Sequence, residues 1–137
     1  MLSRKTKYAF KALAYLVEHK DNGPVLISKI SEERNISRKF LENILLELKR
    51  GGVLNSKKGK GGGYYLKDSA VDTTLSKIIR LMDGPIAMLP CVSLNFYEHC
   101  EDCPSEGECG LHLTMIEVRD KTLSVLDNKT IADLVVR

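Results

Sequence analysis

The first apolar positions of the chain recur with the period of an α-helix. Ser3 is a suitable N-cap residue, and the turn-forming sequence Asn22-Gly23-Pro24 follows the pattern. Six apolar residues form one stripe with a period of 3.6 residues: Tyr8, Ala9, Ala12, Leu13, Leu16 and Val17. The pattern therefore predicts an amphipathic helix over residues 3–20.

Two shorter helical patterns follow, separated by a tight turn. The first covers Ile27 to Arg34, and Asn35 after it tolerates the left-handed conformation that closes a helix. Ser37 is a good N-cap for the second, which runs to about Arg50. Its expected buried stripe consists of Phe40, Leu41, Ile44, Leu45 and Leu48. Two short helices joined in this way form a helix-turn-helix.

A glycine-rich basic loop lies between two short strand-like segments, residues 53–56 and 64–66. The loop, residues 57–63, has the sequence K-K-G-K-G-G-G, and glycine lets the backbone turn tightly and approach another surface. A nucleotide-binding P-loop needs G-x-x-x-x-G-K-[ST] opening a helix, whereas a strand follows here. Helix, helix-turn-helix and basic hairpin together predict a winged helix, which is typical of DNA-binding proteins.

The second half of the chain contains two more helical patterns. One follows the capping residues 72–74 and stops at Gly84-Pro85, and its apolar face consists of Leu75, Ile78, Ile79 and Met82. The other covers about 111–126. The second has an apolar stripe made of Leu111, Met115, Val118, Thr122, Val125 and Leu126. A long helix at the end of a small domain has little core of its own to cover, so we predict a dimerisation helix; packing within the monomer is the alternative. Thr130 is expected to cap a short terminal turn.

Charge is distributed unevenly along the chain. The net charge is +3, but residues 1–67 carry 15 Lys/Arg against 6 Asp/Glu, and residues 68–137 carry 6 against 12. A basic first half favours a polyanionic partner there. No run approaches the ~18 apolar residues that a membrane span needs, and no signal segment follows the N-terminus, so we expect a cytoplasmic protein without a membrane partner. No catalytic Ser/His/Asp arrangement or carboxylate pair is recognisable, and the sequence does not predict an enzyme.

The outer face of the helix 37–50 carries polar side chains suited to base edges. Asn pairs bidentately with adenine, Glu accepts from the cytosine amino group, and Lys reaches guanine or phosphate. The residues of this kind near the N-terminal end of the helix are Arg38, Lys39, Glu42 and Asn43. An ordinary solvated face is the alternative, and the basic loop that follows favours DNA.

All 4 cysteines of the chain lie within 19 residues, at the spacing C-x8-C-x2-C-x5-C. They are Cys91, Cys100, Cys103 and Cys109, with His112 three positions beyond. Such a group indicates a metal or iron–sulfur centre, a disulfide staple or a thiol switch. The five surrounding acidic residues would raise the pKa values of the thiols, and a bound cation or cluster would offset that repulsion. A metal or iron–sulfur centre is therefore the favoured interpretation.

These segments resemble the bacterial winged-helix regulators of the IscR, NsrR and CymR type, the Rrf2 superfamily, over nearly the whole chain. The matching segments are Tyr8-Ala9 with Ala12-Leu13, Gly23-Pro24-Val25, Ile36-Ser37 with Phe40-Leu41-Glu42, Gly59 with Gly61-Gly62-Gly63-Tyr64, Asp83-Gly84-Pro85, the cysteine loop, and the ending Leu126 to Leu134. The resemblance implies a mainly α fold with a small β-hairpin. It also implies a homodimeric transcription factor, here expected to be a repressor, bound to a roughly palindromic DNA operator.

The resemblance also implies roles for individual residues and three regions. Residues 1–84 would form the DNA-binding domain, 85–110 the sensor loop, and 111–137 the dimerisation helix and tail. Expected at the DNA are Ser37, Arg38, Lys39, Glu42, Asn43, Lys57, Lys58, Lys60 and Gly61. Of these, Lys58 occupies the wing position where a basic side chain commonly enters the minor groove.

In the cluster-binding members of this family three cysteines hold an iron–sulfur cluster, and Cys91, Cys103 and Cys109 fall on them. Cys100 is additional to that pattern, and His112 stands where one class of members places a histidine ligand, so both are candidates for the fourth ligand. A 2Fe–2S cluster is favoured over a 4Fe–4S cluster. Zinc, for which only the Cys100-x2-Cys103 pair qualifies as a hook, or a metal-free thiol switch is the alternative. A small iron–sulfur electron carrier is disfavoured by the basic first half.

Overall fold

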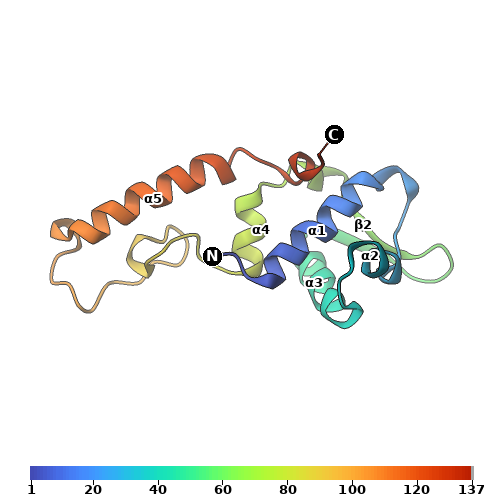
Figure 1. The fold of residues 1–137 in the computed structure, drawn as a ribbon, viewed down its shortest axis with the longest axis horizontal. Helices are drawn as coiled ribbons and strands as arrows, with labels where there is room; N and C mark the ends of the chain where they lie inside the picture. The colour runs from blue at the N-terminus through green and yellow to red at the C-terminus, as the bar shows by residue number, and fades with distance from the viewer. Residues whose placement is uncertain (137) are drawn as a thin grey trace.

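The computed structural model describes residues 1–136 and has an elongated shape. A compact body holds the first half of the chain, and one long helix with the cysteine loop beside it extends from that body (Figure 1). The α-helices and strands are α1 (Arg4–Glu18), α2 (Ile27–Arg34), α3 (Arg38–Arg50), β1 (Leu54–Lys57), β2 (Gly63–Leu66), α4 (Leu75–Met82) and α5 (Gly110–Leu126). Short 3-10 turns are η1 (Lys20–Asn22), η2 (Asp68–Asp72), η3 (Pro90–Val92), η4 (Glu106–Glu108) and η5 (Ile131–Leu134).

Helix α1 begins where the capping residue predicts. The Ser3 hydroxyl oxygen accepts a hydrogen bond from the Thr6 backbone N–H at 3.1 Å. Four of the six predicted stripe residues are buried, whereas Tyr8 and Val17 are half-buried. Tyr15, outside the predicted stripe, is only 1% exposed. Its ring stacks on the imidazole of His19, with 4.0 Å between the ring centroids. The guanidinium of Arg34 from α2 covers the ring at 4.9 Å from its centroid. The apolar periodicity of the sequence does not predict these contacts.

The helix-turn-helix has the predicted bounds. Asn35 adopts the left-handed conformation at φ 51°, and Ile36 then returns to the core at 3% exposure. The Ser37 hydroxyl caps α3 by accepting the Phe40 N–H at 3.5 Å. The predicted stripe of α3 is buried except at Phe40, whose half-buried ring meets Tyr8 of α1 edge-on at 5.6 Å.

The hairpin is antiparallel, with Leu54 opposite Leu66 and Lys57 opposite Gly63. It is tied to the segment before α2, because Val25 and Tyr64 exchange two backbone hydrogen bonds of 2.8 Å. Gly63, at φ 139°, permits this approach: a Cβ there would lie 2.3 Å from the Val25 carbonyl oxygen. The sequence does not predict this long-range pairing. The pairing of Val25 with Tyr64 holds the wing against the helix-turn-helix.

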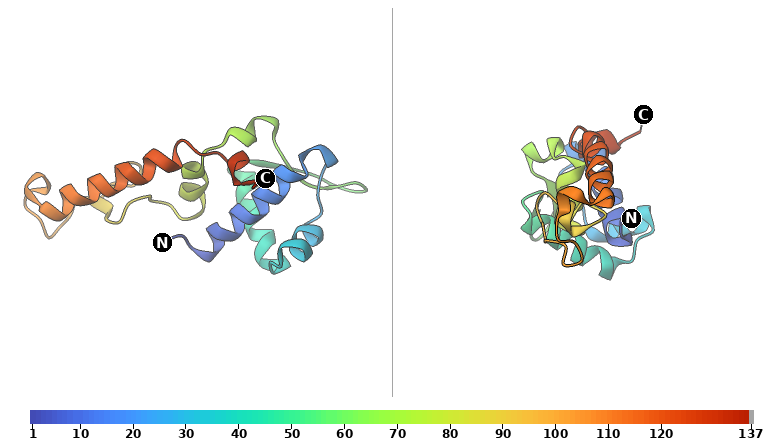
Figure 2. Two further views of the ribbon diagram at one scale, coloured as in Figure 1. Left: turned by 45° about the horizontal axis from the view of Figure 1, so that its top comes forward. Right: turned by 90° about the vertical axis from the view of Figure 1, so that its left-hand side faces the viewer.

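Helix α5 leaves the body and the chain then returns to it. Thr130 caps the predicted terminal turn, and Ile131 within that turn is fully buried against the body. Backbone hydrogen bonds join this return segment to the start of α4: Leu75 N–H to Lys129 oxygen at 2.9 Å, and Ile131 N–H to Thr73 oxygen at 3.0 Å. The loop before α5 runs alongside the helix (Figure 2). Thus α5 is anchored at its C-terminal end, and its N-terminal end lies among the cysteines.

Candidate DNA-binding surface and cysteine site

The predicted base-reading side chains lie on the solvent side of α3. Arg38, Lys39, Glu42 and Asn43 are all exposed, while four buried residues on the opposite side hold the helix in the core. The Arg38 Nε atom lies 3.7 Å from the Glu42 carboxylate, so these two charges are paired in the DNA-free chain. The exposed Ser37 already uses its hydroxyl to cap the helix. The face is polar, accessible and rigidly supported.

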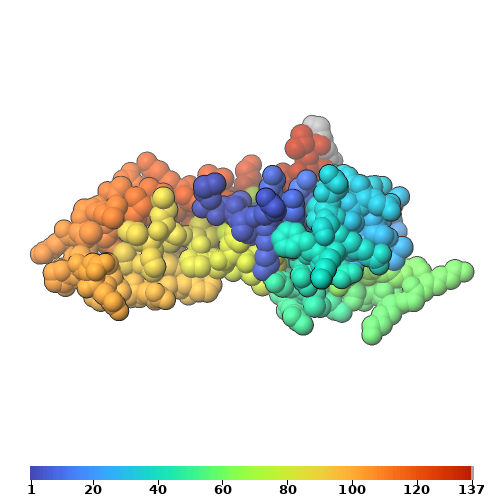
Figure 3. Space-filling view, turned by 60° about the horizontal axis from the view of Figure 1, so that its bottom comes forward, coloured from blue at the N-terminus to red at the C-terminus, as the bar shows by residue number. Residues whose placement is uncertain are grey.

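The wing carries a second exposed group of predicted residues, Lys57, Lys58, Lys60 and Gly61. Positive φ angles at Gly59 and Gly61, 84° and 74°, turn the hairpin tip. Figure 3 shows this tip extending from the body near the atoms of α3. The three lysines are therefore free to approach a polyanion together with α3.

A notch of about 270 Å³ connects α3 with the wing. Arg38, Lys57 and Lys58 line it together with the first turn of α2. Leu26 stands at the N-cap of α2 and makes no side-chain capping bond, which leaves N–H groups at that helix start for an anion. Sequence reasoning had identified the three cationic residues but not the contribution of α2. The poor capping residue Leu26 was the available signal.

The four cysteines and His112 line a single cavity of about 510 Å³. Cys91 lies in the turn η3 and is buried, Cys109 is the N-cap residue of α5, and Cys100 and Cys103 come from the loop between them. All four are free thiols. The structure thus brings together every predicted ligand and contains no disulfide staple among the described residues.

His112 contacts two of the four cysteines. Its Nδ1 atom lies 3.3 Å from the Cys91 sulfur, and its backbone N–H donates to the Cys109 sulfur at 3.4 Å. The side chain of His112 thus contacts the first cysteine of the loop, and its backbone contacts the last. Cys109 and His112 both belong to the start of α5, and both side chains line the cavity.

Burial and negative charge act on the thiols. Burial, then the Glu106 carboxylate and the neighbouring Cys100, raise the pKa of Cys91. Burial likewise raises the pKa of Cys103, and the thiol of Cys103 donates to the Ser105 carbonyl at 3.0 Å. Both thiols are thus neutral at physiological pH in the chain without a ligand. A bound cation would favour their thiolate forms.

Glu106 is the site residue that sequence reasoning missed as an individual. Its pKa is lowered by the hydrogen bond from the Cys100 backbone N–H and then by that from the Tyr97 hydroxyl. The negative charge is therefore fixed inside the cavity wall. The sequence indicated only a general excess of acidic residues around the thiols.

The donors do not converge on one point. Among residues 1–136, no group of three or more His, Cys, Asp or Glu side chains is arranged to hold a single metal ion. They surround a cavity instead, and thiolates with an imidazole are donors that iron–sulfur clusters accept. The same donor types also occur in structural zinc sites, so the donor set fits either group by its chemistry.

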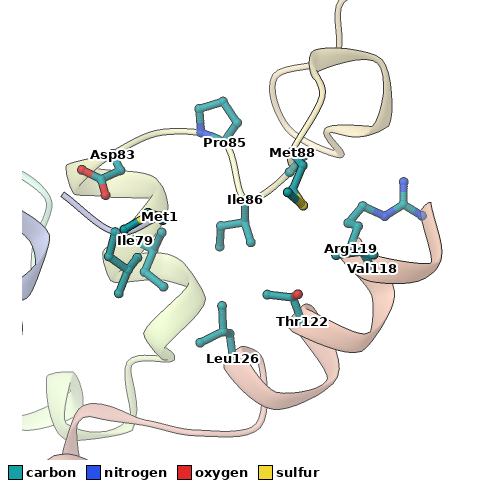
Figure 4. Close-up of a pocket in the computed structure, with 12 residues that line it drawn as sticks. Met1, Ile79, Asp83, Pro85, Ile86, Met88, Val118, Arg119, Thr122 and Leu126 are labelled. Atoms are coloured by element: carbon teal, nitrogen blue, oxygen red, sulfur yellow. The ribbon is translucent and has the colours of Figure 1, made fainter. Parts of the chain in front are cut away.

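An apolar cleft separates α5 from the body. It has a volume of about 310 Å³, and Figure 4 shows Ile79 of α4, Ile86 of the linker, and Thr122 and Leu126 of α5 around it. Along α5, the predicted stripe is largely uncovered: Leu111 is 57%, Val118 36% and Val125 56% exposed. Val118, Thr122 and Leu126 of that stripe line the cleft, and Leu123, which is not part of the stripe, is the buried residue of α5 at 7% exposure. No helix within residues 1–136 is long and apolar enough to span a membrane.

Comparison with known proteins gives a consistent result. The model of the Rrf2 family, described as an iron-dependent transcriptional regulator, matches residues 2–137. A rrf2-like HTH-type transcriptional regulator of Rhodobacter capsulatus is 38% identical over 137 residues, covering 98% of this chain and 91% of the relative. The HTH-type transcriptional regulator IscR of Yersinia pseudotuberculosis is 30% identical over 134 residues, covering 98% and 78%.

Solved structures show the same fold. CymR of B. subtilis, the global cysteine regulator, superposes with a TM-score of 0.78 at 29% identity, covering 98% of this chain and 95% of that one. IscR of T. potens superposes with a TM-score of 0.73 at 26% identity, covering 98% and 85%. The chain therefore belongs to the Rrf2 family of winged-helix transcriptional regulators and is not an enzyme.

Proposed function

We propose that this Rrf2-family regulator is a homodimeric repressor whose affinity for a palindromic operator is set by an iron–sulfur cluster in the cysteine cavity. The observation that carries the proposal is that four free thiols and one imidazole line a single cavity at the start of α5. The description of the family as iron-dependent supports it. Acting on the chromosome, such a protein would work in the cytoplasm.

The DNA-binding role of residues 1–84 follows from the exposed face of α3 and the wing. Lys39, Glu42 and Asn43 would meet base edges in the major groove. Lys58 at the wing tip would enter the adjacent minor groove, with Lys57, Lys60 and Gly61 at the backbone. Arg38 and the uncapped start of α2 border one notch, so a phosphate there would meet both a cation and free N–H groups.

Residues 111–137 would supply the dimer contact. An exposed apolar stripe along a 17-residue helix is costly in water, and a second copy of the same helix can cover it. The cleft beside α4 offers further apolar surface to that copy (Figure 4). Two-fold symmetry would then place two α3 helices against two operator half-sites.

The cluster would be held by Cys91, Cys103 and Cys109, with His112 or Cys100 as the fourth ligand. A bound cluster supplies a redox-active group that is sensitive to oxidants and to the supply of iron. The chain supplies the thiols, and binding of the cluster would change the position of α5. Cys109 is the N-cap of that helix. Val92, the residue after Cys91, accepts a hydrogen bond at its carbonyl from Arg119 of the same helix.

This arrangement gives a physical route from the loop 85–110 to DNA affinity. Ligating Cys91 and Cys109 fixes the first turns of α5, and α5 would set the spacing of the two recognition helices. A 10-fold change of affinity requires only ~1.4 kcal/mol of differential stabilisation. A metal-free thiol switch is the second candidate, and burial, which raises the pKa values of Cys91 and Cys103, disfavours the reactive thiolate at those two positions.

Protein purified without oxygen tests the proposal through iron and sulfide assays and a visible absorption spectrum. We expect matched iron and sulfide and a brown colour that is lost in the Cys103→Ser and Cys109→Ser variants. A matched control is Ser105→Ala, which leaves every candidate ligand in place. A colourless protein that cannot be reconstituted yet binds DNA would contradict the cluster and leave the DNA-binding part standing.

A further inference from the structure

We propose that Glu106 is a positioning residue of the cysteine site, and that its carboxylate fastens the loop 97–106 and fixes Cys100 on the cavity wall. Its fixed charge would also lower the reduction potential of a bound cluster. The second statement rests on the proposed function; the first concerns the chain alone.

The Glu106 carboxylate collects bonds from one short segment of the loop. Its Oε1 atom accepts the backbone N–H of Cys100 at 3.0 Å, and the Tyr97 hydroxyl lies 2.8 Å from Oε2 and 3.0 Å from Oε1. The Nδ1 atom of His99 lies 2.9 Å from Oε1. Three residues within four positions are thus held by one side chain.

These bonds matter because apolar packing contributes little in this region. Leu94, Phe96 and Tyr97 are 61%, 46% and 54% exposed, and within residues 93–109 the one helical segment is the three-residue turn η4. The Glu106 side chain, by contrast, is only 16% exposed. Charge-assisted hydrogen bonds are stronger than neutral ones, and here they hold a loop that has no core of its own.

The position of Cys100 follows from this fastening. Its backbone N–H is fixed by Glu106, and its carbonyl accepts the N–H of Cys103 at 3.4 Å. Both cysteines line the same cavity as Cys91 and His112. Without Glu106, the segment 97–103 loses its attachment to η4, and the spacing of the thiols is no longer preset.

The charge of Glu106 faces the same cavity. A negative charge beside a cluster opposes the addition of an electron, so it lowers the reduction potential. Glutamine at this position keeps one acceptor oxygen and the size of the side chain while removing the charge. Alanine removes both. The pair of substitutions therefore separates fastening from electrostatics.

Hydrogen exchange of the cluster-free full chain, followed by NMR, tests the fastening. We expect Glu106→Ala to speed exchange of the Cys100 amide at least about tenfold, and Glu106→Gln to speed it less. Glu108→Gln, a change of the same charge at an exposed neighbour, should leave it unchanged. Equal exchange of the Cys100 amide in wild type and Glu106→Ala would overturn the fastening. Should the alanine variant not fold, Glu106→Met, which keeps the size of the side chain and has no acceptor oxygen, takes its place.

Redox titration of the cluster-loaded protein tests the charge. The potential should become more positive in Glu106→Gln at unchanged iron and sulfide, and should stay unchanged in Glu108→Gln. An unchanged potential in Glu106→Gln would overturn this part. Wild-type protein that takes up no iron or sulfide would end this part together with the proposed function, whereas the exchange experiment would still decide the fastening.

Discussion

The guanidinium of Arg119 donates a hydrogen bond from Nη1 to the backbone carbonyl of Val92 across 3.0 Å. Val92 is 2% exposed and follows Cys91 directly, and Arg119 lies in the middle of α5. The same guanidinium pairs with Asp120 at 2.9 Å, and its side chain is only 15% exposed. One side chain thus joins the turn that carries a candidate ligand to the helix proposed to set the dimer geometry.

Replacing Arg119 should uncouple the two sites without removing either. We expect Arg119→Met to take up the cluster normally but to reduce the difference in operator affinity between cluster-loaded and cluster-free protein severalfold. Fluorescence anisotropy on both forms measures that ratio. Lys121→Met, which removes a cation from an exposed position of the same helix, is the control. A ratio equal to that of wild type in Arg119→Met would exclude this link.

Asn43 should contribute to sequence reading. Its exposed amide on α3 suits adenine, so Asn43→Ala should cost ~1–3 kcal/mol of operator binding and relax the preference at one base pair in each half-site. Binding to a set of operators with single base-pair changes reveals both effects. A uniform loss over all operators would show instead that Asn43 only contacts the backbone.

Lys58 should behave differently if it serves mainly as a cation of the wing. Lys58→Ala should weaken binding to specific and unrelated DNA alike and reduce the slope of log affinity against log salt by about one. Titrations at several salt concentrations measure the slope. Lys20→Ala, an exposed cation in η1 outside the proposed surface, is the matched control.

The exposed stripe of α5 should hold the dimer together. Val118→Asp places a charge in the middle of that stripe, and we expect a shift from dimer to monomer in analytical ultracentrifugation, because burying an unpaired carboxylate is costly. Ser124→Asp introduces the same charge at an exposed position off the stripe and should leave the dimer intact. Equal association of the two variants would place the interface elsewhere.

The start of α1 should confer a pH-dependent part of the stability. Burial tends to raise the pKa of Asp83, but hydrogen bonds from the hydroxyl and backbone N–H of Ser3 outweigh it and hold the pKa below its usual value. A depressed pKa stabilises the folded chain above the unfolded value near ~3.9, and that contribution is lost as the pH falls through the folded pKa.

Asp83→Asn should therefore lower the free energy of unfolding at pH 7 by less than about 1 kcal/mol, since the group is largely exposed. The difference from wild type should shrink as the pH falls below about 4. Urea unfolding at several pH values measures it. A difference that stays constant down to pH 2 would mean that the carboxylate charge is not responsible.

Periodicity and capping residues predicted the body of this fold. The bounds of α2, the capped start of α4 and the left-handed turn at Asn35 were found as expected, because these features depend on residues near in sequence. The burial of Tyr15 and the pairing of Val25 with Tyr64 were missed. Both are contacts between elements distant in the chain, and no local pattern encodes them.

In the candidate site, too, the sequence predicted some features and missed others. Clustered cysteines and a helix start after Cys109 predicted that the thiols and His112 would gather, and they line one cavity. The fastening by Glu106 was not predicted, because five acidic residues in an irregular loop look alike in sequence. The positions of the sulfur atoms relative to His112 likewise depend on how the loop folds back on α5.

Control of DNA binding by the cysteine cavity can be tested by measuring the operator affinity of the two forms of the wild-type protein. The probe is the genomic fragment that each form, cluster-loaded and cluster-free, selects most strongly. We predict that the two forms differ at least about tenfold on one such fragment, and that Cys109→Ser abolishes the difference. Equal affinities of the two forms on every selected fragment would show that the cysteine cavity does not control DNA binding.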